Sequence, residues 1–151
     1  MFNKQKHRTL LLLLIITLLL LCSCASPGTQ DWSYPLPNDY EIWRINSKSI
    51  VIGYKDPNST GLDTSQGIDE YVFEFCYNER FVCAKQIGVP RESHRPTRGD
   101  NPSYYVIDTL NQEVFGPFDS EGLFILELAR LRITDLTGWI ATVPAPEGAE
   151  H

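Results

Sequence analysis

Apolar and polar positions alternate along much of the chain after Tyr40, with the period of a β-strand that buries one face. Short runs rich in aromatic and β-branched residues are separated by polar turns, and this pattern predicts three successive hairpins. The first hairpin pairs Tyr40–Ile45 with Lys48–Tyr54 and turns at Asn46 and Ser47. The second pairs Glu70–Tyr77 with Phe81–Ile87 and turns at Asn78, Glu79 and Arg80. The third pairs Ser103–Asp108 with Glu113–Phe115 and turns at Leu110, Asn111 and Gln112.

The run from Glu70 to Tyr77 shows this alternation most clearly. Successive side chains of a strand point to opposite faces of the sheet. One predicted face carries Tyr71, Phe73, Phe75 and Tyr77, and the other carries Val72, Glu74 and Cys76. The pattern therefore predicts a sheet with one strongly apolar, buried face.

The period of the pattern changes after Gly116 and Pro117, which are expected to end the third hairpin. Asp119 or Ser120 can then cap a helix that runs to about Leu131. Apolar residues cover much of the surface of this helix, which predicts that it packs on the sheet. They are Leu123, Phe124, Leu126, Leu128, Ala129 and Leu131.

These elements predict an α+β fold, with an antiparallel sheet of about five to seven strands built from hairpins and one C-terminal helix packed on it. The segment Ile133–Val143 has no decisive period. Within it, Trp139–Val143 is a candidate for a closing edge strand.

The first 23 residues follow a different pattern. Met1–Arg8 is polar and cationic, and Leu10–Leu21 is apolar except for Thr17. A helix of these 12 apolar residues would span about 18 Å, whereas the hydrocarbon core of a bilayer is about 30 Å thick. We therefore expect residues 1–23 to be a secretory signal peptide, and a permanent membrane-spanning helix is the alternative.

The residues that end this segment are Leu21, Cys22, Ser23 and Cys24, followed by Ala25. They resemble the lipobox of bacterial lipoproteins, which has leucine at −3, a small residue at −1 and then cysteine. The resemblance implies cleavage between Ser23 and Cys24 and attachment of lipid to the Cys24 thiol. Cys22 fits less well, because leucine would then occupy the −1 position. In that family, aspartate directly after the lipid-bearing cysteine is associated with retention in the inner membrane. Ala25 stands at this position, so the resemblance favours the outer membrane in a cell that has two membranes.

The chain that follows the lipobox has three parts, which differ in composition. Residues 24–38 are rich in Pro, Ser and Gly and are expected to form a flexible tether. Residues 39–143 are expected to form a single α+β domain, and residues 144–151 a disordered tail. This organisation predicts an extracytoplasmic domain held on a cell membrane.

The charge of the chain limits its partners. It has 13 basic and 19 acidic residues, and removal of the signal peptide with Lys4, Lys6 and Arg8 leaves 10 basic residues against the same 19 acidic ones. The resulting net charge of about −9 repels the phosphate backbone of nucleic acids. We therefore expect no nucleic-acid partner, and instead an envelope or extracellular protein.

Two cysteines remain for the folded domain. In the hairpin predicted around Asn78–Phe81, Cys76 and Cys83 lie directly opposite each other, within the reach of a disulfide. Export from the cytoplasm permits oxidation. The sequence therefore predicts a structural disulfide, with two free thiols as the alternative; a reactive cysteine would require a neighbouring base that the sequence does not place.

The stretch Pro90–Ser103 is polar, rich in proline and unusually basic for this acidic chain. A loop of this length is functional or flexible. Its candidate binding residues are Arg91, Arg95, Arg98 and Asp100. Arg98-Gly99-Asp100 resembles the integrin-binding tripeptide of adhesion proteins, although such a short motif also arises by chance. The loop is thus a candidate surface for an acidic partner.

No pattern for catalysis or a cofactor emerges. Asp56–Gly61 begins like a calcium loop, but Gly67 stands where a bidentate acid is required, so ordinary turn chemistry explains it. The histidines after the signal peptide are His94 and His151, and no nucleophile or zinc-protease motif is present. We expect no catalytic residues, no metal site and no cofactor.

Three stretches make the domain similar to small bacterial lipoproteins of unknown function. They are Pro37–Ile42, Tyr104–Thr109 and Val114–Phe118, and each has a structural explanation as a strand or a turn. The hypothesis that follows is a membrane-anchored, non-catalytic binding domain of unknown ligand. The alternative is an enzyme or inhibitor that acts on cell-envelope polymers, and a purely structural envelope component is a third possibility.

Overall fold

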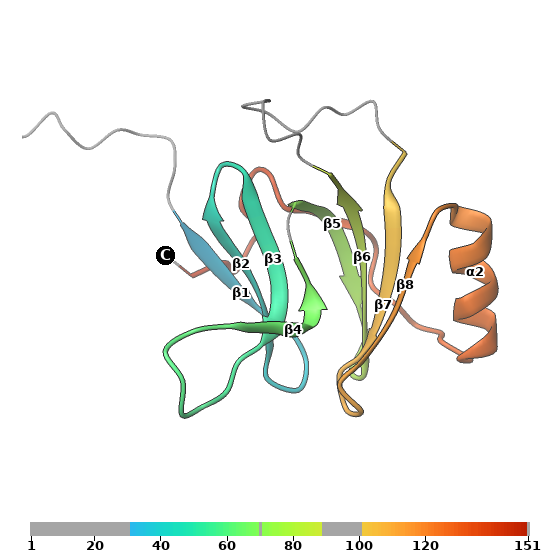
Figure 1. The fold of residues 1–151 in the computed structure, drawn as a ribbon, viewed down its shortest axis with the longest axis horizontal. Helices are drawn as coiled ribbons and strands as arrows, with labels where there is room; N and C mark the ends of the chain where they lie inside the picture. The colour runs from blue at the N-terminus through green and yellow to red at the C-terminus, as the bar shows by residue number, and fades with distance from the viewer. Residues whose placement is uncertain (1–30, 70, 89–100, 151) are drawn as a thin grey trace, which may run out of the picture. The chain divides into compact units, whose positions relative to one another are not determined.

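The computed structural model describes residues 31–69, 71–88 and 101–150, and within these ranges it has nine strands and one helix (Figure 1). The strands are β1 Trp32–Pro35, β2 Tyr40–Asn46, β3 Ser49–Tyr54, β4 Asp63–Ile68, β5 Tyr71–Tyr77, β6 Phe81–Ile87, β7 Ser103–Asp108, β8 Glu113–Phe118 and β9 Ile140–Ala141. The helix is α2, Glu121–Arg130. All three predicted hairpins and the predicted helix are therefore present.

The strands form two antiparallel sheets rather than one. Sheet A has the order β1-β2-β3-β4, and sheet B has the order β8-β7-β6-β5-β9. The β-rich α+β class is confirmed, but the prediction of a single sheet of five to seven strands is wrong. β5 does not continue sheet A after β4. It begins a second layer that packs against sheet A, with β3 and β5 in contact.

The main core lies between the two sheets. Sheet A contributes Ile42, Ile50 and Ile52, and sheet B contributes Val82 and Ile107, all fully buried. These side chains alternate with outward-facing neighbours along their strands, as in other sandwiches of two sheets. Burial of this apolar surface is the principal force that holds the sheets together.

Tyr34 joins the sheets at one edge. From β1 of sheet A, its ring packs against Phe75 of β5 at 5.4 Å between centroids, and its hydroxyl lies 3.0 Å from that of Tyr77. The hydrogen bond to Tyr77 raises the pKa of Tyr34 to about 12, so the Tyr34 hydroxyl remains protonated at neutral pH.

A second apolar cluster covers the outer face of sheet B, where α2 packs (Figure 1). Ser120 caps the helix as predicted, and its hydroxyl accepts a hydrogen bond from the amide of Leu123. Phe124 is the buried residue of the helix and stacks on Tyr104 of β7 at 5.2 Å. The predicted packing of the helix on a sheet is confirmed, although α2 buries a narrower stripe than its sequence suggests.

β8 runs past the predicted strand end at Phe115 and through Gly116 and Pro117 to Phe118. An edge strand tolerates proline because one side of its backbone has no partner strand. Gly116 has a φ of 121°, and a Cβ there would lie 2.7 Å from the carbonyl oxygen of Tyr104. Glycine is therefore required here, where the register between β8 and β7 shifts and the two backbones approach closely.

The predicted face of Val72 in β5 is wrong, because a β-bulge interrupts the alternation of this strand. The register between β5 and β6 shifts between Val72 and Glu74. Val72, which the alternation places opposite Tyr71 and Phe75, is instead fully buried in the same core between the sheets. Beyond the bulge the prediction holds, with Phe75 facing sheet A and Cys76 facing the α2 side.

Both predicted flexible ends extend too far into the chain. β1 lies within the segment expected to be a tether, so ordered structure begins before Asn38. The expected tail is anchored: Ser33 and Glu150 exchange backbone hydrogen bonds of 2.9 and 2.7 Å, and Pro146 is buried. Paired backbone groups and buried apolar contacts hold these segments, although their composition is typical of loops.

The predicted closing strand is shorter than expected, since β9 consists of Ile140 and Ala141 beside β5. Thr142 continues the contact, and its hydroxyl donates to the carbonyl of Val72 at 3.0 Å. Within the described ranges, no helix has the length and apolar character needed to cross a bilayer.

Candidate functional site

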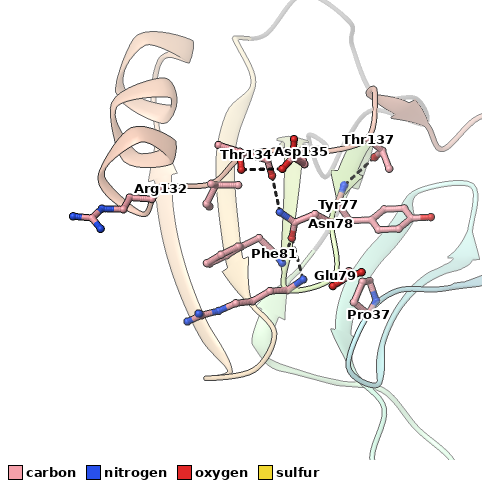
Figure 2. Close-up of a pocket in the computed structure, with 11 residues that line it drawn as sticks. Pro37, Tyr77, Asn78, Glu79, Phe81, Arg132, Thr134, Asp135 and Thr137 are labelled. Atoms are coloured by element: carbon pink, nitrogen blue, oxygen red, sulfur yellow. Dashed lines mark hydrogen bonds between the residues drawn. The ribbon is translucent and has the colours of Figure 1, made fainter.

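A groove of about 720 Å³ lies between the β5–β6 turn and the segment that follows α2 (Figure 2). We call residues 132–137 the strap, because they pass over this turn. The groove is lined by Pro37, Tyr77, Asn78, Glu79, Arg80, Phe81, Arg132, Ile133, Thr134, Asp135 and Thr137. Its walls come from three distant parts of the sequence.

Hydrogen bonds fasten the strap to the turn. The Asn78 side chain donates to the carbonyl of Thr134 at 2.9 Å, and its oxygen accepts from the amides of Arg80 and Phe81 at 2.9 and 2.8 Å. Tyr77 and Thr137 are joined by two further bonds, of 2.8 and 3.0 Å. Asn78 thus shapes the turn and holds the opposite wall at the same time (Figure 2).

A buried carboxylate fixes Arg80 in the groove wall. The Arg80 guanidinium donates two hydrogen bonds to Asp108, of 3.1 and 2.5 Å, and the Asp108 side chain is only 4% exposed. Asn111 donates a further bond to this carboxylate at 2.9 Å. The bond from Arg80 lowers the pKa of Asp108, so the pair is charged at neutral pH.

The strap contains two residues with left-handed backbone conformation. Arg132 has a φ of 55° and Asp135 a φ of 59°. At the opposite side of the groove, Asn38 and Asp39 follow the lining residue Pro37 with φ values of 57° and 61°. This conformation is costly for side chains other than glycine, and residues that adopt it often cluster at functional sites.

The groove therefore presents both signs of charge. Its lining includes the acidic residues Glu79 and Asp135 and the basic residues Arg80 and Arg132, although the Arg132 side chain points away from the groove (Figure 2). In the part of the chain described here, no cluster of three or more His, Cys, Asp or Glu side chains can hold a metal ion. The groove is suited to a polar ligand that carries hydrogen-bond donors and acceptors.

A smaller groove of about 380 Å³ lies where the chain enters β1. It is lined by Asp31, Trp32, Ser33, Trp43, Arg44, Ile45 and Glu150. The Trp32 indole N–H is buried and has no hydrogen-bond partner among the described residues. This groove is more apolar than the first, with Ile45 about half exposed beside it.

The outer face of α2 is the third candidate surface. Leu123, Ile125 and Leu126 are 52%, 55% and 67% exposed, although the sequence suggested broad packing of this helix. A helix that is apolar on nearly every side is normally covered on every side. Contiguous exposed apolar side chains of this kind mark interaction surfaces.

Cys76 and Cys83 are registered partners in β5 and β6, as the hairpin predicts. Both cysteines are buried, and both are free thiols in this structure. The structure thus has the two free thiols that were the alternative to the predicted disulfide. A hydrogen bond between them lowers the pKa of Cys76 and raises that of Cys83. The placement is confirmed, and oxidation of the pair remains a prediction.

The candidate calcium loop is a turn stabilised by its own side chains. Asp56 accepts from the amide of Asn58 at 2.8 Å, Ser59 from that of Gly61 at 3.1 Å, and Asp63 from that of Ser65 at 2.9 Å. These oxygens satisfy local backbone donors, as is usual for Asp and Ser in turns.

The other predicted site residues lie outside the described ranges. They are Ser23 and Cys24 of the lipobox, and Arg91, Arg95, Arg98 and Asp100 of the basic loop, together with His94 and His151. The groove at Asn78 was not predicted. The one signal for it was that Asn78 both begins a tight turn and follows a strand of aromatic residues.

These features define a small β-rich domain with open surfaces suited to binding. A family model described as protein of unknown function (DUF3997) matches residues 37–136, more than half of the chain, and the chain belongs to this family. No curated protein and no solved structure matches the chain.

Proposed function

We propose that the chain is an exported lipoprotein whose folded domain is held on a cell membrane by lipid on Cys24. Support comes from Leu21, Cys22, Ser23 and Cys24 at the end of an apolar run too short to cross a bilayer. Two or three acyl chains, at about 0.8 kcal/mol for each buried CH₂ group, are sufficient to anchor a protein stably on a membrane.

Substitution of the two neighbouring cysteines tests the anchor. Cys24→Ala is expected to block incorporation of labelled palmitate and to leave the longer precursor, whereas the matched change Cys22→Ala leaves both lipid and processing intact. Gel mobility and label in the membrane fraction measure these outcomes. Normal maturation of Cys24→Ala with membrane association would exclude the anchor.

We further propose that the domain binds a protein of the envelope or the cell exterior and performs no catalysis. The observation that carries this proposal is the exposed apolar face of α2, with Leu123, Ile125 and Leu126 turned away from sheet B. Exposure of such side chains is unfavourable in isolation, and a partner that covers them gains about 25 cal/mol for each Å² of apolar surface removed from water.

Two exposed leucines give a matched test of binding. Leu126→Glu places a charge on the outer face of α2, whereas Leu110→Glu places one on the β7–β8 turn, where the leucine is 61% exposed. Only Leu126→Glu is expected to abolish chemical cross-links to partner proteins in intact membranes, as measured by mass spectrometry. Equal cross-linking by both variants would refute the role of α2.

The groove favours a second function, action on a cell-envelope polymer as an enzyme or inhibitor. Its specific support is that two acidic residues, Glu79 and Asp135, line one open cavity together with Arg80, which its bonds to Asp108 hold in place. Carboxylates of this kind serve glycoside hydrolysis when one is protonated and the two flank the bond.

Purified chain incubated with cell-wall fragments distinguishes the two functions. Release of new reducing ends that is lost in both Glu79→Gln and Asp135→Asn would establish the enzyme. Saturable binding of the fragments without hydrolysis, lost in the same variants, would indicate an inhibitor or a polymer-binding domain. Neither activity is expected if α2 is the functional surface.

A further inference from the structure

The outer face of α2 has a regular composition. Ile125 and Leu126 stand at its centre, and the small residues Gly122 and Ala129 stand one turn away on either side, all exposed. Residues spaced by three or four positions share one face of a helix. The face is therefore a ridge of two large apolar side chains between two low positions where another backbone can approach closely.

The charges at the two ends of α2 are opposite. Asp119 and Glu121 lie at its N-terminal end, and Arg130 and Arg132 lie at its C-terminal end. Asp119, Glu121 and Arg132 form no ion pair within the described residues, and Arg130 pairs only with Glu127 of the same helix. An identical helix placed antiparallel would bring each acidic end beside a basic end, and it would also oppose the two helix dipoles favourably.

We propose that α2 pairs with α2 of a second copy of this chain, antiparallel, about a two-fold axis between Ile125 and Leu126. The inference rests on the proposed binding function and names the partner at that same face. The arrangement is self-complementary, as a two-fold interface requires. Ile125 of one copy meets Leu126 of the other, and Gly122 meets Ala129 of the other.

A parallel pair lacks this complementarity. It would place the two acidic ends together and the two basic ends together, and like charges at the ends of adjacent helices repel. It would also stack the small residues of one copy on those of the other and leave a gap at each level. The charge pattern of α2 therefore selects the antiparallel pair.

The strength of the pair follows from its size. A stable dimer buries about 800 Å² of surface on each partner. Contact between two ten-residue helices buries less surface than this. The pair is consequently weak in dilute solution and strengthens when both copies are confined to one membrane surface, because confinement raises their effective concentration.

Single introduced cysteines in the full chain, in its own membranes, test the geometry. Leu126→Cys lies beside the two-fold axis and is expected to form a disulfide-linked dimer under mild oxidation. Ala129→Cys lies about 10 Å along the helix from its symmetry mate and is expected not to link. The unsubstituted chain is the control for the native cysteines. Links in both variants would indicate a parallel pair and overturn the proposal.

The identity of the linked product separates this inference from the proposed function. A dimer of this chain alone supports the pairing. A product containing a different protein overturns the pairing and leaves the binding function intact. If Leu126→Cys becomes linked to no protein, both the pairing and the binding function are overturned.

A second comparison does not depend on introduced cysteines. In the purified full chain at high concentration, Leu126→Glu is expected to weaken self-association by about tenfold or more, and Leu110→Glu to leave it unchanged. Sedimentation measures the association, and circular dichroism verifies that both variants fold. Equal association of the two variants would overturn the pairing.

Discussion

At the scale of single residues, Arg132 occupies a position that usually belongs to glycine. It follows the C-cap of α2, and hydrogen bonds from its amide to Ala129 and from that of Ile133 to Leu128 close the helix in a Schellman arrangement. Its φ of 55° is unfavourable for a residue with a Cβ. Arginine at this position therefore costs stability relative to glycine, and its side chain points away from the groove (Figure 2).

Arg132→Gly is therefore expected to stabilise the domain. Relief of the left-handed conformation is worth about 1 kcal/mol, or about 4 °C in Tm for a domain of this size. Arg132→Ala is the control, since alanine keeps the unfavourable conformation while removing the charge. Thermal unfolding measures both, and equal Tm values for the two variants would show that the backbone is not strained at this position.

Asp108 gives a prediction about pH. Its pKa is lowered in the folded state by the hydrogen bond from Arg80, so its contribution to stability is present above the pKa of the unfolded chain and is lost as pH falls through the folded value. Asp108→Asn is expected to cost about 2 kcal/mol at pH 7, because it removes bonds to a charged, buried group. Urea unfolding should show this difference shrinking below about pH 4. A difference that is constant with pH would contradict the ion pair.

The thiol pair gives a prediction about redox state. Exchange with an oxidised small-molecule disulfide is expected to join Cys76 to Cys83, with loss of one hydrogen from each thiol and release of two reduced thiols from the reagent. The mass then falls by about 2 Da, and closure of the short loop stabilises the domain by about 2–3 kcal/mol. Cys83→Ser is the control. Reactive thiols at both Cys76 and Cys83 in the unfolded, oxidant-treated chain would rule the bond out.

At the scale of elements, the sequence predicted those whose own side chains reveal them. β2, β3, β6 and β7 alternate apolar and polar residues or form continuous apolar runs, and their bounds agree with prediction within one or two residues. Ser120 likewise marks the start of α2. Local chemistry sufficed for these elements.

β1 and β4 were not predicted, because their partners rather than their own residues make them strands. β4 reads Asp-Thr-Ser-Gln-Gly-Ile, a composition typical of a turn, yet Ile68 is buried and pairs with Ile52 of β3. Gly67 is required there, since a Cβ would lie 2.0 Å from the carbonyl oxygen of Ile52. Such tertiary pairing overrides local propensity.

The two faces of α2 give a prediction at this scale. Phe124 is buried against Tyr104, whereas Leu126 is 67% exposed on the same helix. Phe124→Ala is expected to cost about 3–5 kcal/mol, and Leu126→Ala less than about 0.5 kcal/mol. Urea unfolding of the two variants measures the contrast. A similar loss in both would mean that the outer face of α2 is covered within a single chain.

At the scale of the whole folded unit, the C-terminal segment connects the two sheets. β9 and Thr142 pair with β5 of sheet B, and Glu150 pairs with Ser33 of sheet A. Ala145 and Ala149 pack against the core between the sheets. Residues 140–150 therefore close one side of the sandwich.

A chain that ends after Val143 is expected to lose about 2–3 kcal/mol, because it forfeits these apolar contacts and two backbone hydrogen bonds. A chain that ends after Glu150 is the control and should match the full chain. Denaturant unfolding measures the loss. An unaltered midpoint for the shorter chain would mean that this segment behaves as the free tail expected from its composition.

The groove could not have been predicted, because it exists only at this scale. Its walls come from Pro37, residues 77–81 and residues 132–137, which are distant in sequence, and hydrogen bonds of Asn38 to Glu79 and Thr109 support it. No periodicity links these segments. The thiol pair, by contrast, was predictable because one hairpin register places both residues.

The pairing of Ser33 with Glu150 also covers part of the edge of sheet A, because β1 is the outermost strand of that sheet. β1 pairs with β2 on one side, and on its other side the backbone N–H and C=O of Ser33 are bonded to Glu150, so a strand of another molecule would find these groups occupied. This position of the edge is thereby protected against aggregation by strand addition.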